Sequence, residues 1–190
     1  MSQSTSYFEV KPGYVERKVT IPSSKSRSTR LLILGSMTRN DFVIQNISRS
    51  SDVTNLIECI RKIGIKISYR KNEICISDSF PECEKKTERK IRLWPGNGGA
   101  TNRFFIPMLA RGVMEYEINL DPQFGKRPMQ ELYDGLCELG VSILFCKENK
   151  SDRFLLNGPY RNIQKKINID SSKSSQFVSG IAMSLYDKDI

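Results

Sequence analysis

Three stretches of the sequence place serine, glycine or cationic residues directly in front of an apolar run. They are PSSKSRSTR at positions 22–30, GNGGATNR at positions 96–103 and SSKSSQ at positions 171–176. A helix N-terminus has unpaired N–H groups and a partial positive charge, so it attracts anions. Glycine lets a ligand approach the backbone closely, and serine adds a hydroxyl donor. The chemistry that these residue types favour is anion binding.

Two cations in the first stretch have defined places. Lys25 supplies a point charge, and Arg30 follows Ser26 by four residues, so Ser26 and Arg30 share a helical face. A guanidinium there can offer two parallel hydrogen bonds. Arg103 takes the corresponding place 73 residues after Arg30. A single serine-rich start is usually a plain N-cap, but three equivalent starts on one surface would suit a ligand with several negative charges.

The elements that must position these stretches are repeated. NLIECIRKIGIKI at positions 55–67 and ELYDGLCELGVSI at positions 131–143 share their apolar positions and a glycine, Gly64 or Gly140. Each segment predicts an amphipathic helix that ends at this glycine and continues as an alternating strand. The matching residues are 76 positions apart, which indicates an internal repeat.

The flanking segments repeat in the same order, so we predict an α+β fold built from βαβαββ units. Strands are expected at 18–22, 41–47, 65–70 and 73–77, and again at 90–94, 115–120, 141–146 and 153–157. Helices are expected from the first anion-binding stretch to about residue 37, over 51–63, from the second stretch to about residue 111, and over 127–139. A strand at 166–169 and a helix at 177–185 open a third unit. The units are then 19–85, 86–160 and 161–190, with charged linkers at 82–90 and 161–166. Because a unit with one helix would leave its apolar face uncovered, we expect the chain to be part of a longer protein.

Composition narrows the possible functions. Lys and Arg number 30 against 21 acidic residues, so the net charge is +9, which favours anionic partners or indicates an ordinary basic surface. Histidine is absent, which excludes nucleophile activation by histidine. The five cysteines show no CxxC spacing, which favours reduced thiols in the cytoplasm over a zinc site. The sequence predicts neither a membrane span nor a secretory leader.

Four motifs, in order along nearly the whole chain, resemble those of the EPSP synthase (3-phosphoshikimate 1-carboxyvinyltransferase) family. The pattern P-[GS]-x-K-S-x-[ST]-x-R is similar to residues 22–30, and G-N-[AS]-G-T-x-x-R is similar to residues 96–103. R-P-[MI]-x-x-L-x-x-x-L-x-x-L-G is similar to residues 127–140, and S-S-Q-F is similar to residues 174–177.

The resemblance implies a fold and an activity. The family has six βαβαββ units in two inside-out α/β barrel domains, with the active site between the domains. About two and a half units of one domain would lie at 19–190, and residues 1–18 would pack with the other domain. The implied reaction transfers the enolpyruvyl group of phosphoenolpyruvate to the 5-hydroxyl of shikimate 3-phosphate, with no metal or organic cofactor. The implied partners are these substrates and the missing C-terminal domain, in a monomer with no nucleic acid and no membrane.

The resemblance also implies roles for individual residues. Lys25 would be catalytic and contact both substrates. Shikimate 3-phosphate would be bound by Ser26 and Arg30 on its carboxylate side, by Ser174 and Ser175 at its phosphate, and by Gln176. Phosphoenolpyruvate would be bound by Asn97, Gly99, Arg127 and Gln176. Arg27 should face away from the ligands.

Some residues depart from the family pattern or leave alternatives open. In Ala100-Thr101 the usual threonine hydroxyl is displaced by one position. This puts in question the affinity of the pocket for phosphoenolpyruvate and its response to analogues. Asp52 is interpreted mainly as an acid that stabilises a helix N-terminus, and a role in the site is the alternative. One alternative is a UDP-N-acetylglucosamine enolpyruvyl transferase, whose motif has Lys-Asn in place of Lys25-Ser26. Another is a basic nucleic-acid-binding module of related fold, although no aromatic series accompanies the cations.

Overall fold

The structure is a computed structural model, and it describes residues 9, 11–13, 18, 21–71, 73–84, 90–148, 151–163 and 166–187. The helices are α1 (Lys25–Met37), α2 (Ser51–Lys62), α3 (Gly99–Leu109), α4 (Gln130–Glu138) and α5 (Gln176–Ser184), with a 3-10 turn η1 (Phe124–Lys126). The strands are β1 (Phe42–Gln45), β2 (Ile67–Arg70), β3 (Glu73–Ile76), β4 (Ile91–Leu93), β5 (Glu115–Asn119), β6 (Ser142–Glu148) and β7 (Ser151–Asn157). None of the helices in the described part is long and apolar enough to cross a membrane.

The strands form two sheets, and the three strands of the first sheet are ordered like the last three of the second. The first sheet runs β1-β3-β2 and is antiparallel throughout, with Val43 opposite Cys75. The second runs β4-β5-β7-β6, in which β4 and β5 are parallel and the other pairs antiparallel. The predicted repeat is therefore confirmed from β1 to β3 and from β5 to β7. The strand expected at 18–22, the counterpart of β4, lies largely outside the described residues.

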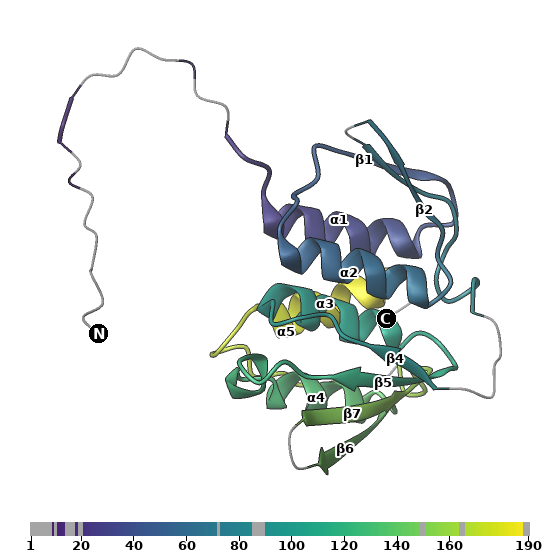
Figure 1. The fold of residues 1–190 in the computed structure, drawn as a ribbon. Coiled ribbons are helices and arrows are strands. Elements are labelled where there is room, and N and C mark those ends of the chain that lie inside the picture. The colour runs from purple at the N-terminus through teal and green to yellow at the C-terminus, as the bar shows by residue number, and fades with distance from the viewer. Residues whose placement is uncertain are drawn as a thin grey trace.

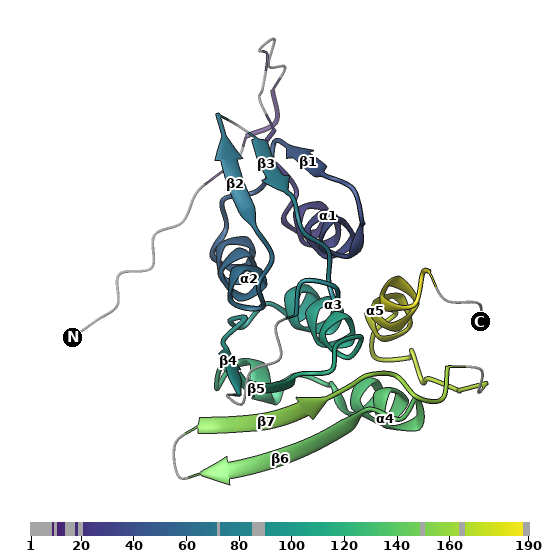
Figure 2. The same cartoon turned by 90° about the vertical axis from the view of Figure 1, so that its right-hand side faces the viewer.

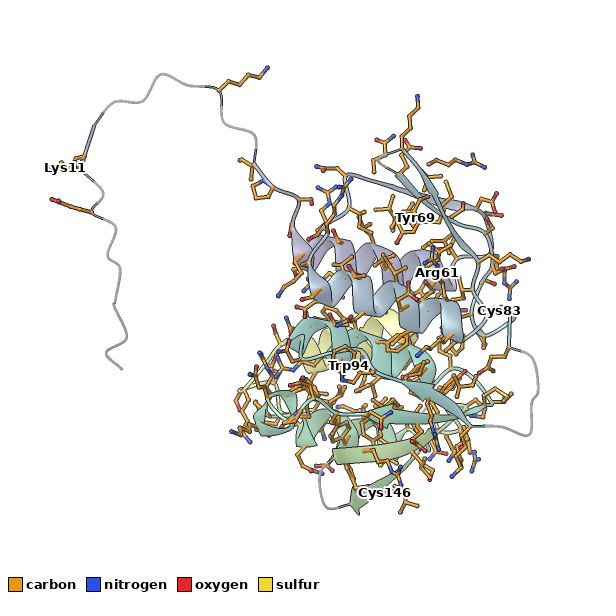
Figure 3. The ribbon with its side chains drawn as sticks, in the orientation of Figure 1. Lys11, Arg61, Tyr69, Cys83, Trp94 and Cys146 are labelled. Carbon is orange, nitrogen blue, oxygen red and sulfur yellow. The ribbon has the colours of Figure 1, made fainter. Side chains whose placement is uncertain are left out.

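The helices lie between the sheets. Figures 1 and 2 show α1, α2, α3 and α5 side by side in the middle of the molecule, with the β1–β3 sheet on one side and the β4–β7 sheet on the other. Leu32, Leu56 and Phe104, from α1, α2 and α3, are fully buried in this layer. On the outer side, Arg61 of α2 stacks over Tyr69 of β2 at 5.1 Å (Figure 3). Helices inside and sheets outside are the arrangement that the resemblance implied.

Glycines act at two kinds of place. Gly64 and Gly140 have φ values of 102° and 85° directly after α2 and α4, which confirms them as the predicted helix ends. Gly180 of α5 lies against the α3 backbone, because a Cβ atom there would be 2.1 Å from the carbonyl oxygen of Arg103. Only glycine permits helices to approach this closely.

Two predicted elements were wrong in part. Helix α4 begins at Gln130 and not at Arg127, because Arg127 precedes a proline and is extended, with ψ of 147°. The strand expected at 166–169 has no regular structure, since no strand lies beside it among the described residues. Ile167 and Ile169 still alternate with exposed neighbours and pack on the core, so the apolar period is used for packing without a sheet.

Candidate functional site

The three predicted anion-binding stretches lie at the beginnings of α1, α3 and α5. These helices start at the same end of the molecule, on the left in Figure 1, and are seen nearly end-on in Figure 2. Side-chain contacts also join one start to the next, because Arg30 of α1 contacts Phe104 of α3 and Arg103 of α3 contacts Gln176 of α5. The convergence expected from the repeat is therefore present in the fold.

At the start of α1, part of the hydroxyl set is structural. Ser24 is the N-cap, and its Oγ accepts a hydrogen bond from the N–H of Arg27 at 3.3 Å. Buried Ser28 donates its hydroxyl to the Ser24 carbonyl and accepts from the N–H of Ser48, both at 2.9 Å. Arg27 is exposed and lines a hollow toward β1. Ser24 and Ser28 are therefore structural, whereas the side chains of Lys25, Ser26 and Arg30 take no part in these capping bonds.

Lys25 is held by a carboxylate from the neighbouring helix. Its Nζ lies 2.7 Å from Oδ2 of Asp52, in the first turn of α2. The Asp52 carboxylate in turn lies against Gly98, where a Cβ atom would be 2.9 Å from Oδ1. Lys25 is thus held at the junction of α1, α2 and the α3 start, with its side chain 54% exposed. An ammonium has three donors, so donors beyond the Asp52 contact are available to a ligand.

Arg30 and Arg103 occupy the same place in successive repeats. Arg30 of α1 donates to the backbone carbonyl of Ser26 at 3.2 Å and to its hydroxyl, and its guanidinium lies 4.6 Å from the ring centroid of Phe104 in α3. The Arg103 guanidinium of α3 lies 5.0 Å from the ring centroid of Phe177 in α5. Each arginine therefore stacks on an aromatic ring of the next repeat. This contact fixes the guanidinium planes and the spacing of the helix starts.

The start of α3 is open to a ligand at its backbone. Gly98 is the N-cap, and no side chain caps the helix. The loop is closed from within by Asn102, whose Nδ2 donates to the carbonyls of Gly96 and Gly98 at 3.0 and 2.9 Å. Gly96 has a positive φ of 76°. The Nδ2 of Asn97 donates to Gln123 at 3.2 Å. The uncapped N–H groups at Gly98 and Gly99 are therefore a suitable place for an anion.

Two guanidiniums converge on Gly99. A Cβ atom at this position would lie 3.2 Å from Nη1 of Arg127 and 3.5 Å from Nη1 of Arg103. Burial, and secondarily the charge of Arg127, lower the pKa of Arg103 below its ordinary value. Among the described residues no carboxylate lies within ion-pair distance of either guanidinium. Two like charges beside an uncapped helix start favour an anion between them.

The start of α5 is joined to the same cluster. Oε1 of Gln176 accepts from Nη1 of Arg103 at 3.1 Å. The Ser174 hydroxyl accepts from the N–H of Gln176 at 3.3 Å, and Ser175 is the exposed N-cap residue without a side-chain cap. Lys173 is held away, with Nζ 2.5 Å from Oε1 of Glu131 on α4. The serine hydroxyls and the helix start together offer several donors to one anionic group.

The structure brings most of the predicted residues into one continuous set of contacts. It runs from Lys25 through Asp52 to the glycines of the α3 start, then to Arg127 and Arg103, and on to Gln176. Thr101 is buried at 1% exposure, so the hydroxyl displaced by one position faces the interior. The sequence analysis missed the stacking rings, although Phe104 and Phe177 are 73 positions apart, as are Arg30 and Arg103. This shared offset was the signal that could have found them.

Comparison with known proteins identifies the family. The family model of EPSP synthase (3-phosphoshikimate 1-carboxyvinyltransferase) matches residues 10–186. The chain belongs to the EPSP synthase family. This confirms the resemblance seen in the four motifs.

Members of the EPSP synthase family cover this chain well but extend far beyond it. The 3-phosphoshikimate 1-carboxyvinyltransferase of Buchnera aphidicola subsp. Cinara cedri is 29% identical over 90% of this chain, and that of Pseudoalteromonas translucida is 30% identical over 89%. The chain spans 39% of the length of each. The solved EPSP synthase from Acinetobacter baumannii superposes with a TM-score of 0.72 at 23% identity, over 87% of this chain and 37% of that one. This likeness shows that the fold is shared.

Proposed function

We propose that this chain forms the part of an EPSP synthase that binds shikimate 3-phosphate, and that the whole enzyme transfers an enolpyruvyl group. In this reaction the 5-hydroxyl of shikimate 3-phosphate loses its proton as its oxygen forms a bond to C2 of phosphoenolpyruvate, while a proton adds to C3. The tetrahedral intermediate then loses phosphate and a C3 proton, which restores the enol ether. The single observation that carries the proposal is the convergence of three helix starts and their cations on one end of the molecule.

The charges of the substrates match this convergence. Both substrates carry a phosphate and a carboxylate, so the pair needs several cations and N–H donors within one site. In the proposal the α5 start, with Ser174 and Ser175, holds the 3-phosphate, and Ser26 with Arg30 holds the carboxylate side. Gln176 lies between the substrates. Phosphate groups at uncapped helix starts are a common arrangement in proteins.

Phosphoenolpyruvate would lie at the α3 start. The convergence of Arg127 and Arg103 on Gly99 supports this placement, because an anion there would meet two guanidiniums and free N–H groups. Asn97 lies in the same loop. Lys25 would contact both substrates from the α1 start. A cation fixed near the reacting carbon stabilises charge that develops in the transition state, which is a large source of rate.

The remaining expectations belong to the same proposal. Residues 19–190 would be the substrate-binding domain, with units at 19–85, 86–160 and 161–190, and residues 1–18 would pack with a second domain. The other half of the site would come from the part of the relatives that this chain does not span. A cytoplasmic, monomeric enzyme fits the family, and the five cysteines are free, as a reducing compartment would keep them.

Binding of shikimate 3-phosphate to the chain tests the proposal. Isothermal titration should show saturable binding, and Lys25→Met should weaken it about tenfold or more, since a charge-assisted contact to a ligand contributes roughly 1.5–3 kcal/mol. Arg27→Met is the matched control. This substitution removes the same charge from the same helix, but the Arg27 side chain lies toward β1. We expect its affinity to stay within about twofold of the unchanged chain.

Three outcomes would contradict the proposal. They are no saturable binding of shikimate 3-phosphate, equal losses in the two variants, and tighter binding of UDP-N-acetylglucosamine or of an oligonucleotide than of shikimate 3-phosphate. The oligonucleotide arm is measured at two salt concentrations, because nucleic-acid binding falls steeply with salt.

A further inference from the structure

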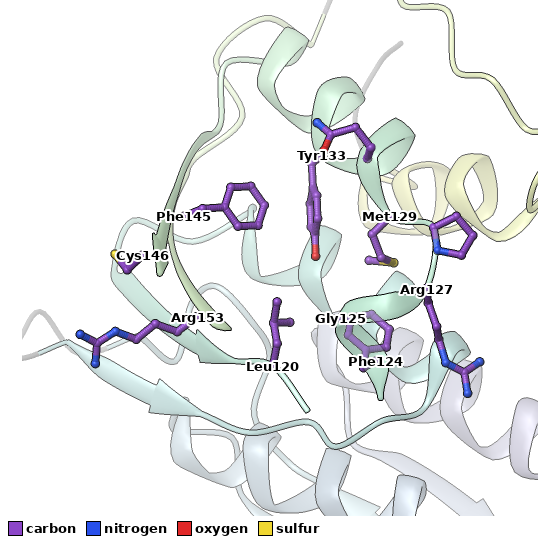
Figure 4. Close-up of a pocket in the computed structure, with 11 residues that line it drawn as sticks. Leu120, Phe124, Gly125, Arg127, Met129, Tyr133, Phe145, Cys146 and Arg153 are labelled. Carbon is purple, nitrogen blue, oxygen red and sulfur yellow. The ribbon is translucent and has the colours of Figure 1, made fainter. Parts of the chain in front are cut away.

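A pocket of about 290 Å³ lies outside the convergence of helix starts, between α4, η1 and the β6–β7 hairpin (Figure 4). Its walls are mainly apolar and aromatic. They include Leu120, Phe124, Met129, Tyr133 and Phe145. The volume is at the lower end of ligand pockets, which run from about 300 to 1,000 Å³, so the pocket suits a small molecule.

The buried tyrosine of this pocket has no hydrogen-bond partner among the described residues. Tyr133 is 6% exposed, and its hydroxyl points into the space between Leu120, Phe124 and Met129 (Figure 4). Burial raises the pKa of Tyr133, so the hydroxyl keeps its proton and remains a donor at neutral pH. Since the hydroxyl opens into the pocket without a partner in the described part of the chain, it is available to donate to an acceptor that enters there.

The ring of Tyr133 is held firmly in place. Its centroid lies 5.2 Å from that of Phe145 and 5.4 Å from that of Phe154, both in edge-to-face geometry. The hydroxyl therefore has a defined direction. Phe145 is 47% exposed at the pocket, so part of its ring is free to pack against a ligand. A flat ring is the shape that such aromatic walls accept best.

The electrostatics of the pocket favour a negative charge. Met129 is the N-cap of α4 and makes no side-chain cap bond to this helix of nine residues. Glu131 lies in the first turn, where its carboxylate accepts from its own N–H and pairs with Lys173. Side chains in a helix point back toward its N-terminus, so the Tyr133 hydroxyl and the other N–H groups of the first turn act on the same region. The lining includes two arginines, Arg127 and Arg153, and no acidic residue. Arg153 pairs with Glu117 at 3.5 Å, and the Arg127 guanidinium turns toward Gly99, so the preference for an anion comes mainly from the helix start and the hydroxyl.

We propose that this pocket binds a small aromatic monocarboxylate. The ring would pack between Phe145 and the Leu120 side of the pocket, and the carboxylate would accept hydrogen bonds from the Tyr133 hydroxyl and from the start of α4. The ligand would accept a hydrogen bond from the Tyr133 hydroxyl and fill an apolar space in the same step.

The pocket is separate from the proposed substrate site but shares a segment with it. Residues 124–125 and 127–130 line the pocket, whereas the Arg127 guanidinium turns away from the pocket, toward Gly99 at the α3 start (Figure 4). The inference depends only on the pocket and does not require the proposed function. A ligand here would contact the segment that carries Arg127, without using its guanidinium.

The test is ligand binding to the chain, with benzoate as the probe. Saturation-transfer NMR and isothermal titration at fixed salt compare benzoate with benzamide, benzyl alcohol, acetate and inorganic phosphate. We expect saturable benzoate binding in the millimolar range or tighter. Benzamide and benzyl alcohol should bind at least about tenfold more weakly, because they lack the charge. Acetate and phosphate should not compete, because they lack the ring.

The decisive variant is Tyr133→Phe, which removes one oxygen and keeps the ring and its packing. It should weaken benzoate roughly fivefold to tenfold, the range of a single hydrogen bond. Tyr69→Phe is the matched control, since Tyr69 is exposed on β2 of the other sheet, at the opposite end of the molecule from the pocket residue Cys146 (Figure 3). Its affinity should not change. Phe145→Ala should weaken all aromatic probes, and thermal unfolding of each variant shows whether the fold is kept.

Several results would overturn the inference. Absence of saturable benzoate binding, or equal affinity in Tyr133→Phe and Tyr69→Phe, removes the assigned site. Equal binding of benzyl alcohol and benzoate shows an apolar cavity without anion preference. Competition by inorganic phosphate shows a general anion site in place of an aromatic one.

Discussion

The Nζ atom of Lys25 lies 2.7 Å from Oδ2 of Asp52, and this ion pair joins the first turn of α1 to the first turn of α2. The two partners are unequally buried, with side-chain exposures of 54% for Lys25 and 10% for Asp52. Asp52 also lies against Gly98 at the α3 start. The Asp52 carboxylate therefore positions Lys25 where the starts of α1, α2 and α3 meet. It also interacts favourably with the N-terminus of its own helix, α2.

The first prediction concerns this carboxylate. Asp52→Asn keeps the size of the side chain but removes its charge, its attraction to the α2 N-terminus and its ion pair. We expect the free energy of unfolding to fall by about 1 kcal/mol, mostly from the helix terminus, because half-exposed lysines form weak ion pairs. Urea unfolding measures the loss. Asp41→Asn, at an exposed position before β1, is the control and should change stability by less than about 0.5 kcal/mol. Equal effects of the two substitutions would show that Asp52 has no special role.

The second prediction concerns the contact between α3 and α5. Arg103 donates to Gln176 and to the carbonyl of Pro128, at 3.1 and 3.0 Å, and stacks on Phe177. Arg103→Lys keeps the charge but cannot keep the planar stack and both hydrogen bonds. We expect a loss of about 1–2 kcal/mol in stability, with faster amide exchange in α5 than in β5.

The control for this prediction is Arg127→Lys. Arg127 is exposed, and it lies beside the same glycine, Gly99. Its replacement by lysine should leave both stability and α5 exchange nearly unchanged. A similar loss in both variants would mean that the stack and hydrogen bonds of Arg103 have no special role, and no loss in Arg103→Lys would mean that its positive charge is sufficient.

The parts of the fold that the sequence predicted well are those governed by local patterns. The 76-residue offset, the glycines that end α2 and α4, and the alternation that follows them at 65–68 and 141–144 depend on local residue patterns only. The beginnings of α1, α3 and α5 were also predictable, because residue types at a helix start have local causes. Their convergence followed from the repeat.

The parts that the sequence missed depend on partners that are distant along the chain. Residues 166–169 have a strand-like apolar period, but a strand also needs a neighbour to pair with, and none lies there among the described residues. The pairing of Lys25 with Asp52 requires α1 and α2 to pack before it can form. The pocket at Tyr133 exists only because η1, α4 and β6 meet, and no short motif encodes such a meeting.

The third prediction concerns pH and the pair Lys173–Glu131. The hydrogen bond from Lys173 lowers the pKa of Glu131 below its ordinary value of about 4.5, and the same pair raises the pKa of Lys173 above 10.5. A lowered carboxyl pKa contributes stability above the unfolded value and loses it as pH falls through the folded value. A raised ammonium pKa contributes below 10.5 and loses that contribution as pH rises further.

Glu131→Gln should therefore destabilise the chain at pH 7, and this difference should begin to shrink below about pH 4.5 and vanish as pH falls through the lowered folded pKa, where the wild-type carboxylate is protonated. Urea unfolding of both proteins at pH 7 and at pH 3 measures the difference. In a Lys173→Met background the effect of Glu131→Gln should shrink at pH 7, because the partner is already gone. An effect of the same size at both pH values would show that packing and not charge is responsible.

The last prediction concerns Gly180, where α5 meets the backbone of α3. A Cβ atom here would lie 2.1 Å from the carbonyl oxygen of Arg103 and 3.2 Å from its carbonyl carbon. These are backbone atoms, so no side-chain rotation can relieve the clash, and the helices must separate. Alanine favours a helix over glycine by about 1 kcal/mol, whereas overpacking of a core costs about 1–3 kcal/mol and displaces Phe177 as well. Gly180→Ala should therefore destabilise the chain by about 1–2 kcal/mol in urea unfolding.

The control is Val178→Ala, at an exposed position of the same helix, which should change stability by less than about 0.5 kcal/mol. A stabilised Gly180→Ala protein would mean that helix propensity outweighs the contact and that α3 and α5 have room to spare.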